Sequence, residues 1–200
     1  MKTENSTLMK MAKESLHGKW LLAIGTFVLY GIIVGAIAAM AEYSSIMSLV
    51  TLLIAGPFTL GVAIFSLAIS RDEDARFEQI FAGFHNFGAS LGAYLGAYLL
   101  MIVFTFLWTL LLIIPGIIAA ISYAMTFYIL ADDESIGAME AIDKSKEMMH
   151  GHKWDYFVLM LMYLGLGVLC LLTCGIGFFW LIPFVQVTNA KFYDDIKRIQ

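Results

Sequence analysis

Residues 131–154 read ADDESIGAMEAIDKSKEMMHGHKW, and this polar stretch separates two long apolar segments of the chain. Its last part, SKEMMHGHKW at 145–154, nearly repeats AKESLHGKW at 12–20, with one residue inserted. In both places a charged, amphipathic stretch is followed by a His-Gly junction, a Lys-Trp pair and then apolar sequence. This pattern predicts a helix on the membrane surface that leads into a membrane-spanning segment, used more than once.

The composition is that of an integral membrane protein. Of 200 residues, 60% are hydrophobic and 14% are charged, and the mean hydropathy is +0.83, which lies outside the usual range of soluble domains. Four runs lack charged residues, and each is long enough for the roughly 20 residues that cross a bilayer: residues 20–41, 43–70, 79–131 and 156–190. The last two exceed one crossing, so we expect turns at Pro115-Gly116 and at residues 174–177.

We therefore predict an all-α fold with six transmembrane helices arranged as three hairpins, each preceded by an amphipathic cytoplasmic helix. The third span covers roughly residues 91–113 and the fourth roughly residues 117–130. In the second cytoplasmic helix, an aromatic stripe within residues 77–87 should lie on the membrane surface or beneath the bundle, and in the third, Ile136, Met139 and Ile142 share one apolar side. Residues 1–200 form a single membrane domain, with approximate internal repeats at 5–72, 73–133 and 134–195. The second half of each hairpin contains a proline and leads out to an aspartate: Pro57 and Asp72, Pro115 and Asp132, Pro183 and Asp194. The spacings between proline and aspartate differ, so the repeat holds only in outline.

The positive charges all fall on one side of this arrangement. The twelve Lys and Arg residues lie near the two termini, at Arg71 and Arg76, and in residues 144–153, whereas the connections expected on the other side carry none. Because positively charged loops remain in the cytoplasm, we expect a multi-pass plasma-membrane protein with both termini in the cytoplasm. Trp20 and Trp154 should then lie at the inner interface, and Trp108 and Trp180 at the outer one.

Polar side chains near the end of the last predicted span form one candidate site. Gln186 and Asn189 share a helix face, Thr188 stands between them, and Pro183 leaves a backbone carbonyl free nearby. A small polar binding site would use these groups. Hydrogen bonding between helices explains the same residues, and we favour that interpretation.

Three hydroxyl side chains recur at matching positions of the predicted hairpins. Ser66, Thr126 and Thr188 each lie six residues before the aspartate that ends their hairpin. They would line a shared path, together with Ser122, or they would simply pack between helices. Because Ser and Thr are common in membrane helices, we favour packing.

Histidines flank the two junctions and raise the question of metal binding or pH sensing. His150 and His152 are two residues apart, a spacing that directs side chains to different faces of a helix, and no third ligand is adjacent. We therefore interpret the junction residues as interfacial anchors: Trp20, Trp154, His17, His150, His152 and Lys153.

Two further local features have structural interpretations. Cys170 and Cys174 would have Cβ atoms about 5–6 Å apart on a continuous helix, beyond the roughly 3.5–4.5 Å of a disulfide. We expect free thiols there unless the helix breaks at Thr173. Residues 132–135, DDES, would suit a metal or lipid-headgroup site, but we favour a cap that also supplies negative charge to the first turn of the helix that follows.

The chain shows no sign of enzymatic chemistry. No ionisable side chain stands in the middle of a predicted span, where each would cost on the order of 2.5–3.5 kcal/mol, which argues against a proton-coupled pump or an intramembrane protease. Phosphate-binding glycine loops, paired nucleophile and base, metal motifs and nucleic-acid signatures are absent from the sequence. We expect no catalytic residue, cofactor or metal site.

The chain closely resembles the bacterial integral membrane family known as domain of unknown function 975. The matching residues are IPGI at 114–117, YAMTFY at 123–128, Ala131-Asp132, Ala141-Ile142, Ser145-Lys146 and GHKW at 151–154, and residues 12–20 and 180–193 fit as well. It is more distantly similar to the membrane region of some glycerophosphodiester phosphodiesterases, whose catalytic barrel it lacks. The resemblance implies a bacterial plasma-membrane location and supplies no catalytic residues.

Two functional hypotheses fit these features. The first is a non-enzymatic accessory, scaffold or regulatory subunit of a membrane or envelope assembly. The second is a transporter or export factor for a small, lipid-like or peptide substrate, because repeats and proline-interrupted helices are common in transporters. An enzyme acting on lipid headgroups ranks third. The expected partner is the lipid bilayer; a membrane-protein partner or self-association stays open, and nothing indicates nucleic acid.

Overall fold

The computed structural model describes residues 3–41, 45–85, 92, 96–104, 113–133 and 135–199. Most of these residues are helical and none of them forms a strand, so the all-α prediction is confirmed. The named elements are α1 (Asn5–Ser15), α2 (Trp20–Ala41), α3 (Ser45–Ser70), the 3-10 helix η1 (Phe77–Phe84), α5 (Ile113–Ser122), α6 (Thr126–Asp132), α7 (Ala138–Met148), α8 (Lys153–Leu172) and α9 (Phe178–Lys197).

Three helices of the described residues are long and apolar enough to cross a membrane, at Trp20–Ala39, Leu53–Ser70 and Lys153–Leu172. The first and third expose most of their apolar side chains, for example Leu21 at 87% and Leu172 at 78%. Such surfaces suit hydrocarbon and are unusual in water. The fold therefore fits a membrane protein with three candidate spans. About half of the predicted third span, roughly residues 91–113, lies outside the described residues.

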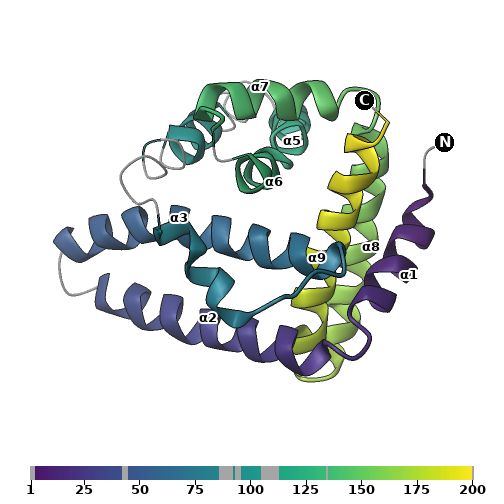
Figure 1. Cartoon of the computed structure of the whole chain (residues 1–200), viewed down its shortest axis with the longest axis horizontal. Coiled ribbons are helices and arrows are strands. Elements are labelled where there is room, and N and C mark those ends of the chain that lie inside the picture. Colours follow the sequence, from purple (N-terminus) through teal and green to yellow (C-terminus); the bar gives the residue numbers. More distant parts are fainter. Residues whose placement is uncertain are drawn as a thin grey trace.

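The long helices form two pairs that run crosswise to each other (Figure 1). In the first pair, Phe27 of α2 meets Phe65 of α3 edge to face at 6.0 Å, and Tyr30 meets Phe58 at 5.8 Å. α8 and α9 form the second pair. This crosswise arrangement does not confirm the six-helix bundle of three hairpins that the hydropathy pattern predicts.

α3 is the central helix, and η1 packs directly along it. A Cβ atom at Gly61 would overlap the backbone carbonyl of Ile80, and one at Gly83 would overlap that of Pro57. The two backbones therefore touch because both contact positions are glycines. Part of the aromatic stripe expected on the membrane surface or beneath the bundle lies against α3, because Phe58 packs on Phe81 and Phe84. Phe77 of the same stripe is 47% exposed, and residue 87 lies outside the described residues.

The two sequence junctions have the same backbone conformation. α1 and α7 each end a few residues before a glycine with positive φ, Gly18 at 77° and Gly151 at 84°, a conformation that glycine adopts without strain. Two backbone hydrogen bonds also correspond between the junctions. In the first, the His17 N–H donates to the Glu14 carbonyl at 2.9 Å, as the His150 N–H does to the Glu147 carbonyl at 3.0 Å. In the second, the Lys19 N–H donates to the Leu16 carbonyl at 2.9 Å, as the His152 N–H does to the Met149 carbonyl at 3.1 Å. The sequence motif that recurs at the two junctions therefore has the same backbone conformation in both places.

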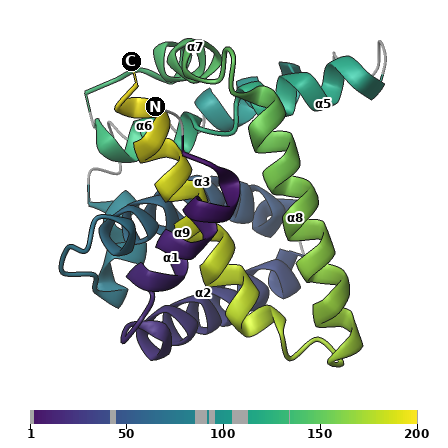
Figure 2. The same ribbon diagram turned by 90° about the vertical axis from the view of Figure 1, so that its right-hand side faces the viewer.

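The amphipathic faces are largely as expected. α1 lies against α9 (Figure 2) and buries Leu8 and Ala12, with Leu16 just beyond its end. α7 buries a face centred on Ala141, Ser145 and Met148. Met139, which the sequence places on the buried side, is exposed, because it points away from that centre.

One of the two predicted turns is correct. The chain reverses between α8 and α9, where Cys174 and Gly175 both have positive φ, and the two cysteines are free thiols. Pro115-Gly116 instead lies in the first turn of α5, a position that tolerates proline. The helix break falls later, between Ser122 and Thr126, and it divides the predicted fourth span, residues 117–130.

Candidate functional site

The ends of α3, α6 and α9 meet at one arginine. Arg71, which directly follows α3, donates from Nη1 to Asp132 Oδ1 at 2.7 Å and from Nη2 to Asp194 Oδ1 at 2.8 Å. Asp132 ends α6, and Asp194 belongs to the last turns of α9. The two carboxylates are nearly buried, with side chains 12% and 13% exposed. One guanidinium thus joins three helices that are far apart in the sequence.

Further polar groups complete what we call the Arg71 cluster: Ser70, Arg71, Asp132, Lys191, Tyr193, Asp194 and Lys197. The Tyr193 hydroxyl donates to Asp132 Oδ2 at 3.0 Å, and Lys197 also donates to that carboxylate. Ser70 donates to Asp194 Oδ2 at 3.2 Å, while Lys191 donates to the Ser70 carbonyl. The acceptors of the cluster are bound by its own donors.

The cluster strongly favours the charged form of Asp132. Burial alone would raise the pKa of this carboxyl, but hydrogen bonds from Arg71 and Lys197 outweigh that effect and lower its pKa from 3.8 to about 2. Burial likewise lowers the pKa of Arg71, whereas its bonds to Asp132 and Asp194 raise it above the ordinary value. Arg71 and Asp132 therefore keep their charges at neutral pH, which suits a structural lock rather than proton transfer.

Acid should weaken this lock in a defined pH window. Because the folded-state pKa of Asp132 lies below its ordinary value, the stability that it contributes is complete above about pH 4 and is lost as pH falls toward about 2. The melting temperature of the wild type in detergent should therefore approach that of Asp132→Asn as pH falls through this range. A constant difference between the two proteins from pH 7 down to the acid limit would contradict this assignment.

The amides of the sequence-predicted site pair with tyrosines. The Tyr128 hydroxyl of α6 donates to Gln186 Oε1 at 3.1 Å, and the Tyr163 hydroxyl of α8 donates to Asn189 Oδ1 at 3.0 Å. Both amides belong to α9, so these bonds connect it to two neighbours. The structure brings Gln186 and Asn189 together with partners from other helices.

The predicted hydroxyls mostly bond within their own helices. Ser66 donates to the Val62 carbonyl, Ser122 to that of Ile118 and Thr188 to that of Phe184, each at 2.7 Å. Such bonds to the preceding turn satisfy a hydroxyl without a partner helix. Thr126 differs, because its Oγ1 is buried without a hydrogen-bond partner among the described residues. It begins α6, directly after the helix break.

Ser145 of α7 bonds to both sides of the helix break between α5 and α6. Its hydroxyl donates to the Ser122 carbonyl at 2.8 Å and accepts the Met125 N–H at 3.3 Å.

The prediction that residues 132–135 cap the next helix is wrong. Gly137 is the residue that precedes α7, and Asp132 belongs to the Arg71 cluster. Asp133 instead closes a local turn by accepting hydrogen bonds from Ser135. Glu134 lies outside the described residues.

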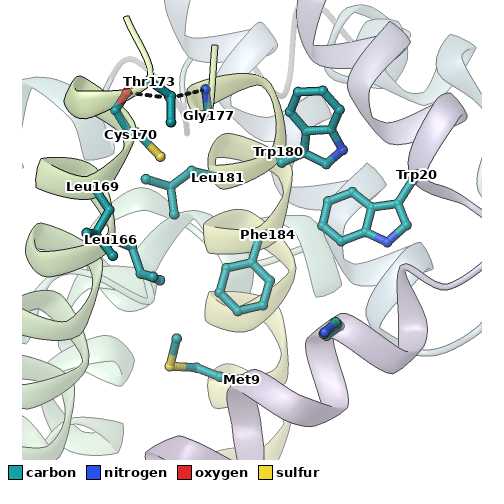
Figure 3. Close-up of a pocket in the computed structure, with 11 residues that line it drawn as sticks. Met9, Trp20, Leu166, Leu169, Cys170, Thr173, Gly177, Trp180, Leu181 and Phe184 are labelled. Atoms are coloured by element: carbon teal, nitrogen blue, oxygen red, sulfur yellow. Dashed lines mark hydrogen bonds between the residues drawn. The ribbon is translucent and has the colours of Figure 1, made fainter. Parts of the chain in front are cut away.

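An apolar groove runs between α1, α8 and α9 (Figure 3). It has a volume of about 430 Å³ and is lined mainly by large apolar side chains, among them Leu166, Trp20, Trp180, Leu181 and Phe184. Trp20 and Trp180 were expected at opposite membrane faces, and Figure 3 shows their rings together in one groove, which does not fit that placement. Trp108 lies outside the described residues.

The remaining anchors lie at the surface. Trp154 is 69% exposed, His17 and His150 are exposed, and His152 and Lys153 are partly buried. Among the residues that the structure describes, no group of three or more His, Cys, Asp or Glu side chains could hold a metal ion.

The family described as "Protein of unknown function (DUF975)" matches residues 1–115 and 96–200. The chain belongs to this family. The two matched segments overlap and together span the whole chain, so the resemblance inferred from residues 114–154 is confirmed. No curated protein and no solved structure matches, and the more distant similarity to the membrane region of phosphodiesterases stays a prediction.

Sequence reasoning about this DUF975 protein missed its main polar cluster. It singled out Asp132 and Asp194 as the exits of two hairpins but assigned Arg71 only to a positive loop. A signal existed, because an arginine directly after a long apolar run needs an anionic partner if it is to be buried. Tyr128 and Tyr163 carried a similar signal, since a tyrosine within an apolar segment usually bonds to a polar group.

Proposed function

We propose that this DUF975 protein is a non-enzymatic accessory, scaffold or regulatory subunit of an assembly in the bacterial plasma membrane. The observation that carries the proposal is the internal pairing of its buried polar groups. Arg71 is bonded to two carboxylates, and the amides of Gln186 and Asn189 accept from tyrosines. A carrier must exchange such bonds with a substrate, whereas a scaffold keeps them.

The proposal includes a multi-pass topology with both termini in the cytoplasm. The one-sided distribution of positive charge supports it. The terminal segments also lie together, because Thr3 donates from its backbone N–H and its hydroxyl to the Asp195 carboxylate. Six spans built from internal repeats remain part of the proposal, and the matched conformations at Gly18 and Gly151 support a repeated unit.

The groove between α1, α8 and α9 supplies a surface for a partner. Its lining is apolar along α8 and α9, and Lys13 of α1 is the one charged side chain among the described residues that line it. A membrane-embedded helix of a partner protein, with its apolar side chains in the groove, suits this surface, because packing of apolar side chains drives helix association in membranes.

Photo-crosslinking in native membranes tests this contact. A photoreactive amino acid at Leu166 or Leu181, which line the groove, should give protein adducts of one discrete mass, because the partner helix lies within reach. Matched lipid-facing positions such as Leu161 and Ile32, both exposed and apolar, should give lipid adducts only. Lipid adducts alone at all four positions would contradict the accessory-subunit proposal.

One observation favours a transporter as the second candidate. The helix break between α5 and α6 leaves the buried Thr126 hydroxyl without a partner among the described residues, and discontinuous helices with free polar groups form the substrate sites of many transporters. The two candidates differ in whether water reaches this region in the folded protein.

A further inference from the structure

A second cavity lies between α5, the end of α7 and the start of α8, with a volume of about 550 Å³. One part of its lining is apolar and includes Phe104, Ile118 and Ala119. The other part is basic and consists of Lys146, His150 and Lys153. The cavity therefore combines a hydrocarbon-like wall with two lysines and a histidine.

The basic side chains are held at the edge of this wall. The Lys146 Nζ lies 5.8 Å from the ring centre of Phe104 and 5.7 Å from that of Tyr123, which are favourable cation–π distances. Lys146 also pairs with Asp143 at 2.8 Å on the exposed side of α7. No carboxylate stands among the described residues that line the cavity; Asp143 meets Lys146 from outside the lining, so the cavity itself presents basic groups only.

The position of the cavity fits the membrane interface. Lys153 begins α8, one of the three apolar candidate spans. The next residue, Trp154, is 69% exposed and packs on Phe157 with ring centres 5.5 Å apart. Exposed tryptophan and lysine at the start of an apolar helix are typical of the headgroup region of a bilayer.

We propose that this cavity binds an anionic phospholipid. The headgroup phosphate pairs with Lys146, His150 and Lys153, and an acyl chain lies against Ile118 and Ala119. Basic pockets between membrane helices bind anionic headgroups because the cations neutralise the phosphate. The apolar wall distinguishes a phospholipid from free phosphate, which gains nothing from it.

The earlier copy of the junction provides a comparison within the chain. Lys19 precedes Trp20 as Lys153 precedes Trp154, but Lys19 pairs with Asp72 at 3.4 Å. Lys153 lines the cavity instead. The same sequence motif therefore makes a protein contact at the first junction and contributes to a cationic site at the second, which assigns the lipid to the second junction alone.

Lipid binding by the full-length protein in detergent, measured by native mass spectrometry, tests the proposal. The wild type should bind phosphatidylglycerol about tenfold more tightly than phosphatidylcholine, given the contribution of each basic residue near a headgroup. The triple variant Lys146→Gln, His150→Gln, Lys153→Gln should lose this preference. The matched triple Lys10→Gln, His17→Gln, Lys144→Gln removes the same charges from exposed positions and should keep it. Equal preferences in the two triples would overturn the proposal.

A second pair of variants tests the apolar wall at constant charge. Ala119→Phe fills the cavity from its buried lining and should weaken phosphatidylglycerol binding several-fold, by loss of the acyl-chain contact. Ala120→Phe, at the exposed neighbouring position, should have no effect. Unchanged binding by Ala119→Phe would contradict the proposed contact between the acyl chain and this wall. Displacement of the lipid by an equal concentration of inorganic phosphate would identify a phosphate site instead.

Discussion

Replacing Arg71 with alanine should lower the free energy of unfolding by about 3 kcal/mol, because the change leaves two nearly buried carboxylates without their shared cation. Asp132 and Asp194 have side chains only 12% and 13% exposed. Arg71→Lys keeps the charge but loses the planar geometry that serves both carboxylates, so it should restore only part of the stability. Denaturant titration in a fixed detergent provides the measurement.

A charge-free variant separates this explanation from simple loss of packing. The triple change Arg71→Ala, Asp132→Asn, Asp194→Asn removes the stranded charges and should recover much of the stability lost in Arg71→Ala. Such recovery is expected because a buried ion pair costs most when only one partner is removed. A triple variant that is less stable than Arg71→Ala would show that the Arg71 cluster does not act as described.

Changing Gly61 to alanine should displace η1 from α3. The added Cβ would overlap the Ile80 carbonyl, and a backbone atom cannot move aside as a side chain can, so we expect a loss of about 3 kcal/mol, at the upper end for overpacking. Gly31→Ala in α2 is the control, since nothing lies within 4 Å of a Cβ there. That change should be neutral or should stabilise the helix by about 0.5–1 kcal/mol.

Hydrogen exchange provides a local measurement for the same pair of variants. In Gly61→Ala the amides of Phe77–Phe84 should lose protection, whereas in Gly31→Ala they should keep it. If both variants unfold with equal stability and η1 stays protected in each, the close contact between α3 and η1 would be wrong.

Local features were predictable from the sequence. The buried face of α1 follows from apolar spacing, the junctions at Gly18 and Gly151 from a conformation that glycine prefers, and the turn between α8 and α9 from its glycines. The polar partners of Gln186 and Asn189 were predictable in kind, as hydrogen bonds between helices, but Tyr128 and Tyr163 were not predictable by name.

Long-range features were not predictable in this way. Arg71 lies 61 positions from Asp132 and 123 positions from Asp194, and no local pattern links residues so far apart. The aromatic stripe of η1 fits a lipid surface and a helix surface equally well. Gly61 and Gly83 decide between them, because they let two backbones touch. Likewise, Pro115 led us to predict a turn, but it lies in the first turn of α5, where a proline does not interrupt the helix.

The central claim is that the buried polar side chains are enclosed by the packed helices and line no path. Cysteine labelling in native membranes tests it, with Cys170 and Cys174 replaced by alanine. Cysteines at Ser66, Thr126 and Thr188, all fully buried, should react with a water-soluble maleimide only after denaturation. Cysteines at the exposed positions of Lys10 and Lys144 should react in the folded protein once the cytoplasmic side is accessible. Labelling of the three buried positions in folded protein at the rate of Lys144→Cys would contradict the scaffold account and favour a transport path.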